Sequence, residues 1–132
     1  MKRSPALLKL SREHHTALVL ALQIARADDP ETMAELLVSV PAIFRDEVDA
    51  HFQREDDELL PRLAAAGALV LVERTLAEHR EMRNLVAQMS AGDVRALKPF
   101  GAMLKAHVHF EERELFVTAE TILPAAYLGR HA

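Results

Sequence analysis

Two segments of the chain repeat the same pairing of a histidine with a carboxylate. His51 is followed four residues later by Glu55, and His107 is followed four residues later by Glu111. On an α-helix, residues four apart lie on the same face. Each segment therefore directs one imidazole and one carboxylate toward the same point in space.

Two further histidines stand upstream of these segments, each directly after a glutamate, in the pairs Glu13-His14 and Glu78-His79. The chain thus offers a histidine and then a His-x3-Glu segment, twice in succession. This order is what two similar halves would contribute to a shared metal centre. Four imidazoles and two carboxylates buried together would be costly without a cation to neutralise them. The sequence therefore predicts a metal site.

Composition restricts the kind of protein and the kind of site. The 132 residues carry a net charge of -4 with no basic block, which argues against nucleic acid as the main partner. Apolar residues make up 50% of the chain and only four residues are glycine, which suits a single helical domain with its own core. Because the chain has no cysteine, any metal must be held by nitrogen and oxygen.

No segment predicts secretion or membrane insertion. The start of the chain is basic, but no continuous apolar run follows it as in a signal peptide. The apolar stretch 17–27 is interrupted by Gln23 and Arg26, and it is shorter than the roughly 20 residues that a membrane span needs. We therefore expect a soluble cytoplasmic protein with no membrane partner.

Hydrophobic periodicity predicts four helices, at about residues 5–27, 30–61, 68–90 and 100–119. Asp29-Pro30 is a helix-start signal, because a capping side chain precedes a proline whose missing N–H costs nothing in the first turn. Gly67 separates the second helix from the third, and Pro41 is expected to kink or restart the second. The sequence thus predicts an all-α, up-down-up-down four-helix bundle, formed by a single domain over residues 1–132.

Each predicted helix carries one of the four histidines on its inward face. In the third helix the inward stripe is expected to be Leu69, Val72, Leu76, His79 and Val86. Counted from the same end of the bundle, the four histidines lie within about 5 Å of one another in depth, at about 1.5 Å per residue. Long side chains absorb this scatter, so the four imidazoles are expected to converge.

At these residues the chain resembles the hemerythrin-like family, also called the HHE cation-binding domain. The resemblance covers nearly the whole chain and rests on the two Glu-His pairs and the two His-x3-Glu segments. It implies a non-haem centre of two irons inside the bundle, bridged by two carboxylates. Carried over residue by residue, the implied metal ligands are His14, His51, Glu55, His79, His107 and Glu111.

The chain departs from the oxygen-carrying members of that family at two places. Those members have a His-x3-His pair on the third helix, whereas the positions four residues before and after His79 are Thr75 and Arg83. They also place the fourth-helix carboxylate five residues after the histidine, where this chain has Glu112 beside Glu111. The smaller histidine set argues against a reversible oxygen carrier. It leaves open positions on both irons for O2, peroxide, NO or water.

Two neighbouring pairs keep alternatives open in this ligand assignment. His14 continues the inward stripe of the first helix, but leucines frame His15 equally well. Glu111 repeats the four-residue spacing of the earlier segment. Glu112 would come inward only if the fourth helix rotated by ~100° or bulged by one residue.

The other polar residues near these segments are expected to have ordinary structural roles. His109 points away from the inward stripe and is assigned to the surface. His131 lies in a C-terminal tail, residues 124–132, which either docks on the bundle or frays. The acidic run of the second helix that contains Asp56 is expected to be mostly a solvated face.

Three functions are compatible with the sequence. The leading expectation is a di-iron protein that binds or reacts with O2, peroxide or NO, in sensing, detoxification or iron handling. A second is an enzyme at the same irons, with peroxidase, catalase-like or ferroxidase activity. A third is a metal-free helical interaction module whose histidines are polar core residues. No acid, base or nucleophile beyond the ligands separates the first two.

Overall fold

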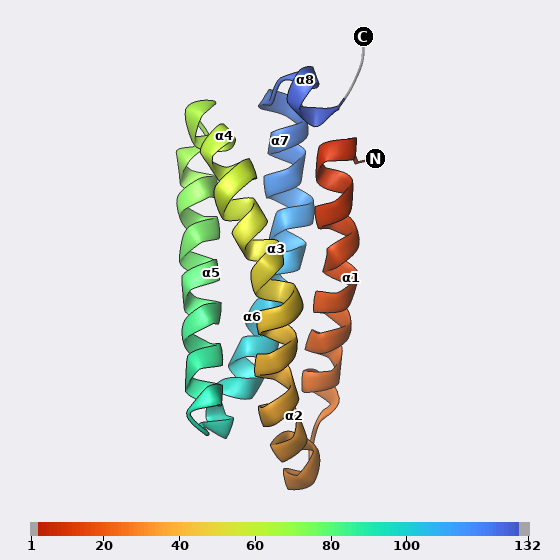
Figure 1. The fold of residues 1–132 in the computed structure, drawn as a ribbon, viewed down its shortest axis with the longest axis vertical. Coiled ribbons are helices and arrows are strands. Elements are labelled where there is room, and N and C mark those ends of the chain that lie inside the picture. The colour runs from red at the N-terminus through yellow and green to blue at the C-terminus, as the bar shows by residue number, and fades with distance from the viewer. Residues whose placement is uncertain (1–2, 130–132) are drawn as a thin grey trace.

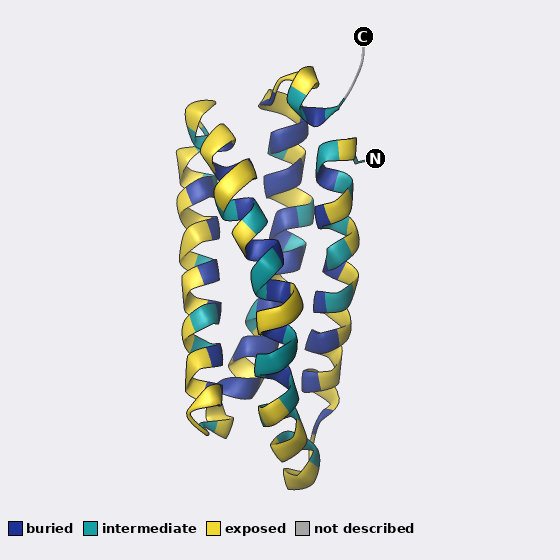
Figure 2. Cartoon of the chain, viewed as in Figure 1, coloured by how far each residue is buried: buried dark blue, intermediate teal, exposed yellow. Residues whose placement is uncertain are grey.

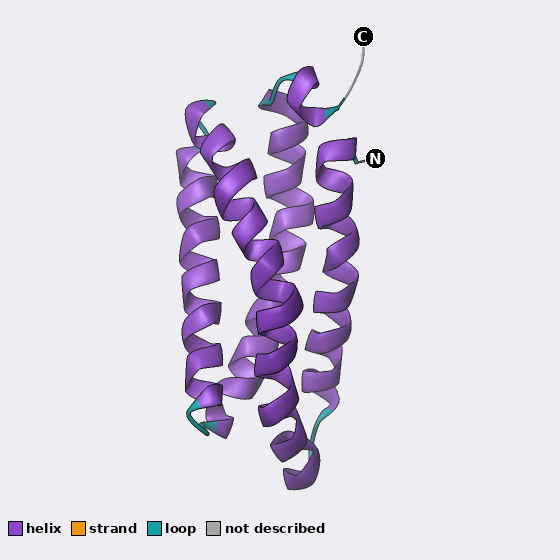
Figure 3. Cartoon of the chain, viewed as in Figure 1, coloured by secondary structure: helices purple, strands orange, loops and turns teal. Residues whose placement is uncertain are grey.

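The protein folds into long helices that run side by side along one axis. A computed structural model describes residues 3–129, and helices account for nearly all of them (Figure 3). Within that range there is no strand, so the prediction of an all-helical fold is confirmed. No helix of residues 3–129 is both long enough and apolar enough to cross a membrane.

The helical elements form four long runs and one short helix at the end of the described chain (Figure 1). The first run is α1, Pro5–Arg26, and the third is α5, Leu69–Ser90. The second run consists of α2 (Pro30–Ile43), the π-helical turn η1 (Phe44–Val48), α3 (Asp49–Arg54), the π turn η2 (Glu55–Leu59) and α4 (Leu60–Ala65). The fourth consists of the 3-10 turn η3 (Val94–Ala96), α6 (Leu97–Phe110), the π turn η4 (Glu111–Leu115) and α7 (Phe116–Ile122). The short helix is α8, Ala125–Leu128.

The helix-start signal at Asp29-Pro30 is confirmed, whereas α1 begins in a different way. The side chain of Asp29 accepts a hydrogen bond from the backbone N–H of Thr32 at 2.8 Å and so caps α2. At the start of α1 the backbone N–H of Ser4 instead donates to the Glu120 carboxylate of α7 at 2.7 Å, and the Ser4 hydroxyl donates to the same group. The first helix is therefore anchored to the last long one.

The prolines inside the second run do not end it. The predicted end at Pro61 is wrong, because the helix continues to Ala65, and Pro41 lies within α2 without restarting it. In a π turn each N–H bonds the carbonyl five residues back, as Leu60 does to Glu55. The pattern of backbone hydrogen bonds has therefore already changed when the chain reaches Pro61, which has no backbone N–H to donate. The helix α6 also begins earlier than predicted, and Pro99 lies in its first turn, where backbone N–H groups have no acceptor within the helix.

A layer of buried polar side chains divides the apolar core into two clusters. The buried faces of the helices turn toward one another along the whole length of the molecule (Figure 2). One cluster includes Ile24, Phe100 and Leu104, and the other includes Leu63 and Phe116. The buried histidines and glutamates predicted to hold metal lie between these two clusters along the chain.

The inward stripe of α5 differs from the prediction at two positions. Leu69 and Leu76 are 55% and 39% exposed, whereas Thr75, His79 and Met82 are fully buried. Thr75, four residues before His79, and Met82, three after it, lie on the same side of His79 around the helix. Leu76, three residues before His79, lies on the other side, ~100° from Thr75. The prediction assigned the inward positions to the apolar residues. The threonine takes the inward position because its hydroxyl donates to the backbone carbonyl of Leu71 at 2.7 Å.

The C-terminal segment docks on the bundle as far as the structure describes it. Leu128 of α8 is buried in the second apolar cluster. The ring of Tyr127 lies 4.3 Å from the guanidinium carbon of Arg62 on α4, a cation–π contact. His131 lies outside the described residues.

A close contact between α1 and α6 gives a test of the packing. A Cβ atom at Gly101 would lie only 2.7 Å from Cγ2 of Ile24 and 3.0 Å from its Cβ. Gly101→Ala should lower the free energy of unfolding by about 1–3 kcal/mol, although alanine favours helix by about 1 kcal/mol. Urea denaturation would measure this change. Adding Ile24→Ala should cost less in that background than in the wild type, and an unchanged or higher stability of Gly101→Ala would contradict the packing.

Candidate metal centre

The six side chains that the sequence singled out meet in one buried layer. They come from α1, α3, η2, α5, α6 and η4, so every long helical run contributes to the layer. Each of the six is between 0% and 4% exposed. These inner residues are His14, His51, Glu55, His79, His107 and Glu111.

The inner residues form two groups that share both glutamates. One group joins His14 and His51 to Glu55 and Glu111, and the other joins His79 and His107 to the same two glutamates. Within each group the donor atoms lie within 4.8 Å of one another. Two cations placed in these groups would have the same two carboxylates between them.

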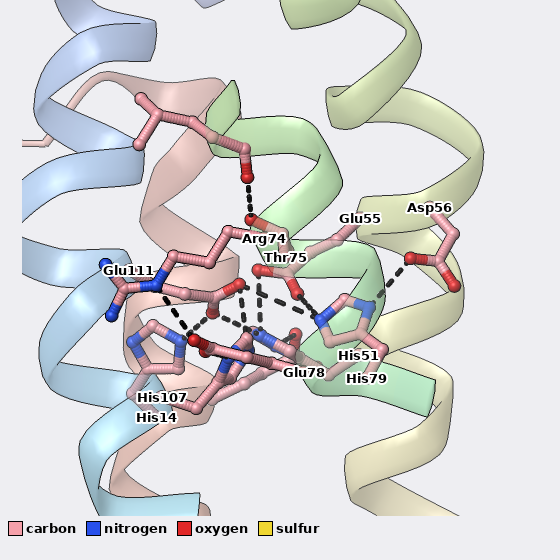
Figure 4. A network of polar contacts seen from close by, with 12 residues as sticks. His14, His51, Glu55, Asp56, Arg74, Thr75, Glu78, His79, His107 and Glu111 are labelled. Atoms are coloured by element: carbon pink, nitrogen blue, oxygen red, sulfur yellow. Dashed lines mark hydrogen bonds and ion pairs between the residues drawn. The ribbon is translucent and has the colours of Figure 1, made fainter. Parts of the chain in front are cut away.

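Each imidazole turns its Nε2 atom toward the shared carboxylates (Figure 4). On Glu111, Oε1 lies 2.7 Å from Nε2 of His14 and Oε2 lies 3.2 Å from Nε2 of His107. On Glu55, Oε2 lies 3.2 Å from Nε2 of His51 and Oε1 lies 3.1 Å from Nε2 of His79. Every carboxylate oxygen of the inner layer thus faces an imidazole nitrogen.

Most of these close approaches are not hydrogen bonds. Both oxygens of Glu55, Oε2 of Glu111, and Nε2 of His79 and His107 are buried and have no hydrogen-bond partner. Buried polar atoms are rarely left in this state, because each costs roughly 1–3 kcal/mol. Nitrogen and oxygen lone pairs that converge on a common point fit a cation, and their ligand type suits iron.

A second layer of carboxylates fixes the orientation of the imidazoles. In each histidine the other ring nitrogen, Nδ1, lies within hydrogen-bond distance of an acidic side chain from a different helical run. An Nδ1–H bonded in this way leaves Nε2 as the free lone pair. The four pairs are His14 with Glu112 at 2.5 Å, His51 with Glu13 at 3.2 Å, His79 with Asp56 at 2.8 Å, and His107 with Glu78 at 2.6 Å.

These outer carboxylates, Glu13, Asp56, Glu78 and Glu112, link the helical runs in a closed ring. Each run gives one carboxylate to a histidine of the next run, and the fourth run returns one to the first. Each outer carboxylate is also adjacent in the sequence to an inner residue, so a single helical turn contributes side chains to both the inner and the outer layer.

An arginine neutralises each outer carboxylate. These outer arginines form ion pairs that are partly exposed, so each contributes less than a buried pair would. The pairs are Arg54 with Glu13, Arg83 with Asp56 at 3.2 Å, Arg74 with Glu78 at 2.9 Å, and Arg3 with Glu112 at 3.0 Å.

The structure places both members of each ambiguous pair. His14 lies in the inner layer and His15 is exposed. The fourth run does bulge, at η4, and Glu111 faces the inner layer while Glu112 reaches Nδ1 of His14. The two glutamates therefore contact opposite nitrogens of the same imidazole.

The sequence interpretation missed the outer layer in part. The expectation that Asp56 belongs to a solvated face is wrong, because its side chain is 15% exposed and contacts His79. Asp56 follows Glu55 directly, so the turn that sends Glu55 inward also turns Asp56 toward α5. An acidic residue stands directly beside four of the six inner residues, His14, Glu55, His79 and Glu111, and this was the signal that pointed to this layer. His109 is partly buried and takes no part in the inner layer.

The electrostatics of the metal-free layer favour protons on the imidazoles. Burial lowers the pKa of His51, but Glu55 and Glu111 outweigh burial and raise that pKa to about 11. Burial likewise lowers the pKa of His107, and Glu111 raises it to about 10 overall. Burial and the nearby Glu111 raise the pKa of Glu55. Burial also raises the pKa of Glu111, but His107 and the other imidazoles outweigh it and hold that pKa well below its ordinary value.

A cavity reaches the inner layer from one side. Its volume is about 200 Å³, and residues of α1, η1, α3 and α6 line it. His14, His51 and His107 border the cavity together with apolar side chains such as Leu104. Phe52, which also lines the cavity, covers His79, with the two ring centroids 4.0 Å apart and nearly parallel. A small molecule in the cavity would meet the His14 and His51 group.

Comparison with known proteins points to one family. Residues 6–119 match the family described as Hemerythrin HHE cation binding domain. The uncharacterized proteins Rv2633c of Mycobacterium tuberculosis and Mb2666c of Mycobacterium bovis are each 32% identical to this chain over 111 residues. The match covers 79% of this chain and 66% of each relative, slightly under two thirds of their length. No solved structure matches the chain significantly.

The outer layer can be tested at two adjacent aspartates. Asp56→Asn removes the charged partner of His79 Nδ1 and should weaken metal binding by about 10- to 100-fold. Asp57→Asn is the matched control, because Asp57 is exposed and accepts a hydrogen bond from Gln53 on the surface. Competition with a chelator would measure the affinity of each variant. Equal affinities of the two variants would contradict a role for the outer layer.

The pKa shifts predict opposite pH dependences with and without metal. The pKa values of His51 and His107 in the folded protein, about 11 and about 10, exceed the ordinary value of about 6.5. Protonation of these imidazoles therefore stabilises the metal-free fold fully below pH about 6.5, and this contribution is lost as the pH rises through about 10 to 11. Metal needs neutral imidazoles, so its added stabilisation should instead grow with pH.

Denaturation curves at several pH values, with chelator and with metal, would measure both trends. The free energy of unfolding of the chelated protein should fall from about pH 7 to about pH 10. The increment on adding metal should be larger at about pH 8.5 than at about pH 6. A metal increment that does not depend on pH would show that the imidazoles are not where the metal binds.

Proposed function

The chain belongs to the hemerythrin HHE cation binding domain family, and on that premise we propose that it holds two non-haem irons. The proposed protein binds or reacts with O2, peroxide or NO, in sensing, detoxification or iron handling. The observation that carries the proposal is the set of buried nitrogen and oxygen atoms without hydrogen-bond partners, in two groups with shared carboxylates. Iron bound there would supply redox chemistry and open positions for a small ligand.

In this proposal His14 and His51 hold one iron, and His79 and His107 hold the other. Glu55 and Glu111 bridge the two, which would hold the cations close together while offsetting their charge. Zinc is a poorer fit, because structural zinc prefers four tetrahedral ligands without a second site. The matching order of a histidine and a His-x3-Glu segment in each half supports this division.

We place this centre in an up-down-up-down four-helix bundle, with α8 as an addition to the bundle. The domain is proposed to span residues 1–132, and the protein to act in the cytoplasm. The four long runs that lie side by side in Figure 1 support the bundle. The ring of outer carboxylates supports it too, because each run contacts the next in chain order.

The cavity on the His14 and His51 side supports a small-ligand role. Apolar side chains that include Ala17, Val48 and Val108 line much of it, so an uncharged molecule such as O2, NO or hydrogen peroxide would enter more readily than a large polar substrate. Residues that line it also belong to the inner layer, so such a molecule would reach iron directly.

An enzyme acting on peroxide at the same irons is the alternative that this cavity also supports. Turnover of hydrogen peroxide by the iron-loaded protein would separate an enzyme from a binding protein. A metal-free interaction module is less compatible with the structure, because it leaves both carboxylate oxygens of Glu55 and Oε2 of Glu111 without hydrogen-bond partners.

The proposal is tested by metal content. Protein produced with ample iron and no histidine tag should carry close to two irons per chain and absorb in the near ultraviolet. His51→Ala and His107→Ala should lose most of this iron, because each removes an inner imidazole. His15→Ala is the matched control, since it lies beside His14 but is exposed.

Elemental analysis together with the absorption spectrum would read out every variant. Chelation should lower the melting temperature of the wild type more than that of His51→Ala, because metal stabilises only the assembled centre. One zinc per chain with no second metal would refute the di-iron proposal.

A further inference from the structure

Two carboxylates stand at the rim of the cavity that leads to the inner layer. Asp46 and Glu47 belong to the π turn η1, and both are exposed and line the cavity. The charge of Asp46 is shared with Arg45 at 3.4 Å, in a pair that is exposed on both sides. Glu47 makes no hydrogen bond or ion pair with any residue in the described range 3–129, so no neighbouring side chain there neutralises this carboxylate at the cavity mouth.

The inner end of the same cavity is lined by nitrogen and oxygen atoms that could bind a cation. His107 and Glu111 line it, and each has a buried donor atom, Nε2 and Oε2, without a hydrogen-bond partner. His14 and His51 line it as well. The cavity therefore runs from an exposed negative mouth to the donor atoms of the inner layer.

The cavity lining includes one arginine, Arg54, which is paired with Glu13 of the same lining. Elsewhere around the inner layer, arginines lie over phenylalanine rings at three seams between helical runs. These contacts are Arg74 over Phe110 at 3.8 Å, Arg3 over Phe116 at 5.5 Å and Arg83 over Phe52 at 5.8 Å from the ring centroids.

We propose that Glu47, assisted by Asp46, captures divalent cations at the cavity mouth and passes them to the inner layer. The inference rests on the proposed metal centre and adds the route by which the centre is filled. An unpaired carboxylate at the mouth of a low-dielectric cavity raises the local concentration of cations and so the rate of their entry. It does not contribute to the final site, so it changes the rate of loading and not the amount of metal bound.

The rate of cation uptake separates this role from a structural one. Metal-free protein would be mixed with Co²⁺ in a stopped-flow instrument, and the d–d absorption of the bound ion followed. At low ionic strength Glu47→Gln should load about three-fold more slowly than the wild type, and Glu47→Lys about ten-fold more slowly. The differences should shrink at about 0.5 M salt, where exposed charges are screened. Final stoichiometry, measured by elemental analysis, should equal that of the wild type.

Glu81→Gln serves as the matched control, because Glu81 is an exposed glutamate of α5 that does not line the cavity. It should load at the wild-type rate. Normal loading by Glu47→Lys, with the full amount of metal bound, would overturn the capture role and leave the metal centre standing. Failure of the wild type itself to take up metal would overturn the centre and the capture role together.

Discussion

Two fully buried carboxylates, Glu55 and Glu111, lie between apolar clusters, and a buried charge without compensation costs several kcal/mol. The side chains around these two carboxylates offset that free-energy cost. Four imidazoles face the two carboxylates, four outer carboxylates hold the imidazoles, and four arginines hold the outer carboxylates. The outer carboxylates and arginines balance each other, at -4 and +4. The inner charge of -2 is therefore left for protons or metal cations to offset.

This layered arrangement also explains why the helices are not regular. The π turns η2 and η4 begin at Glu55 and Glu111, the two residues that the groups share. A π turn widens the helix by one residue and changes which side chains face inward. In each repeat it lets one acidic residue enter the inner layer while its neighbour, Asp56 or Glu112, turns to a histidine on another run. At Asp56 and Glu112 the irregular backbone and the outer layer thus have one cause.

The sequence predicted the inner layer better than its surroundings. Helical spacing places His51 with Glu55 and His107 with Glu111 without knowledge of the fold, because all four lie on local inward stripes. The partners of Nδ1 are non-local, so periodicity does not reveal them. Leu76 was predicted to face inward because it is apolar and lies three residues before His79, but the polar Thr75, on the other side of His79 around the helix, takes the inward position. The extension of the second run past its proline depends on a π turn, which propensity does not predict.

The two halves of the chain repeat in sequence, but their surroundings break the symmetry. Phe52 lies against His79 at 4.0 Å between ring centroids, whereas His14 stacks on Phe116 at 5.4 Å and borders the cavity. None of these contacts belongs to the repeated motif. Two equal sets of ligands can therefore differ in which small molecules reach them. The packing around the imidazoles would control this access, whereas the imidazoles themselves would bind the metal. In the proposed centre, residues outside the ligand set, such as Phe52 and Phe116, would shape access to the metal, so access could be changed while the ligands are kept.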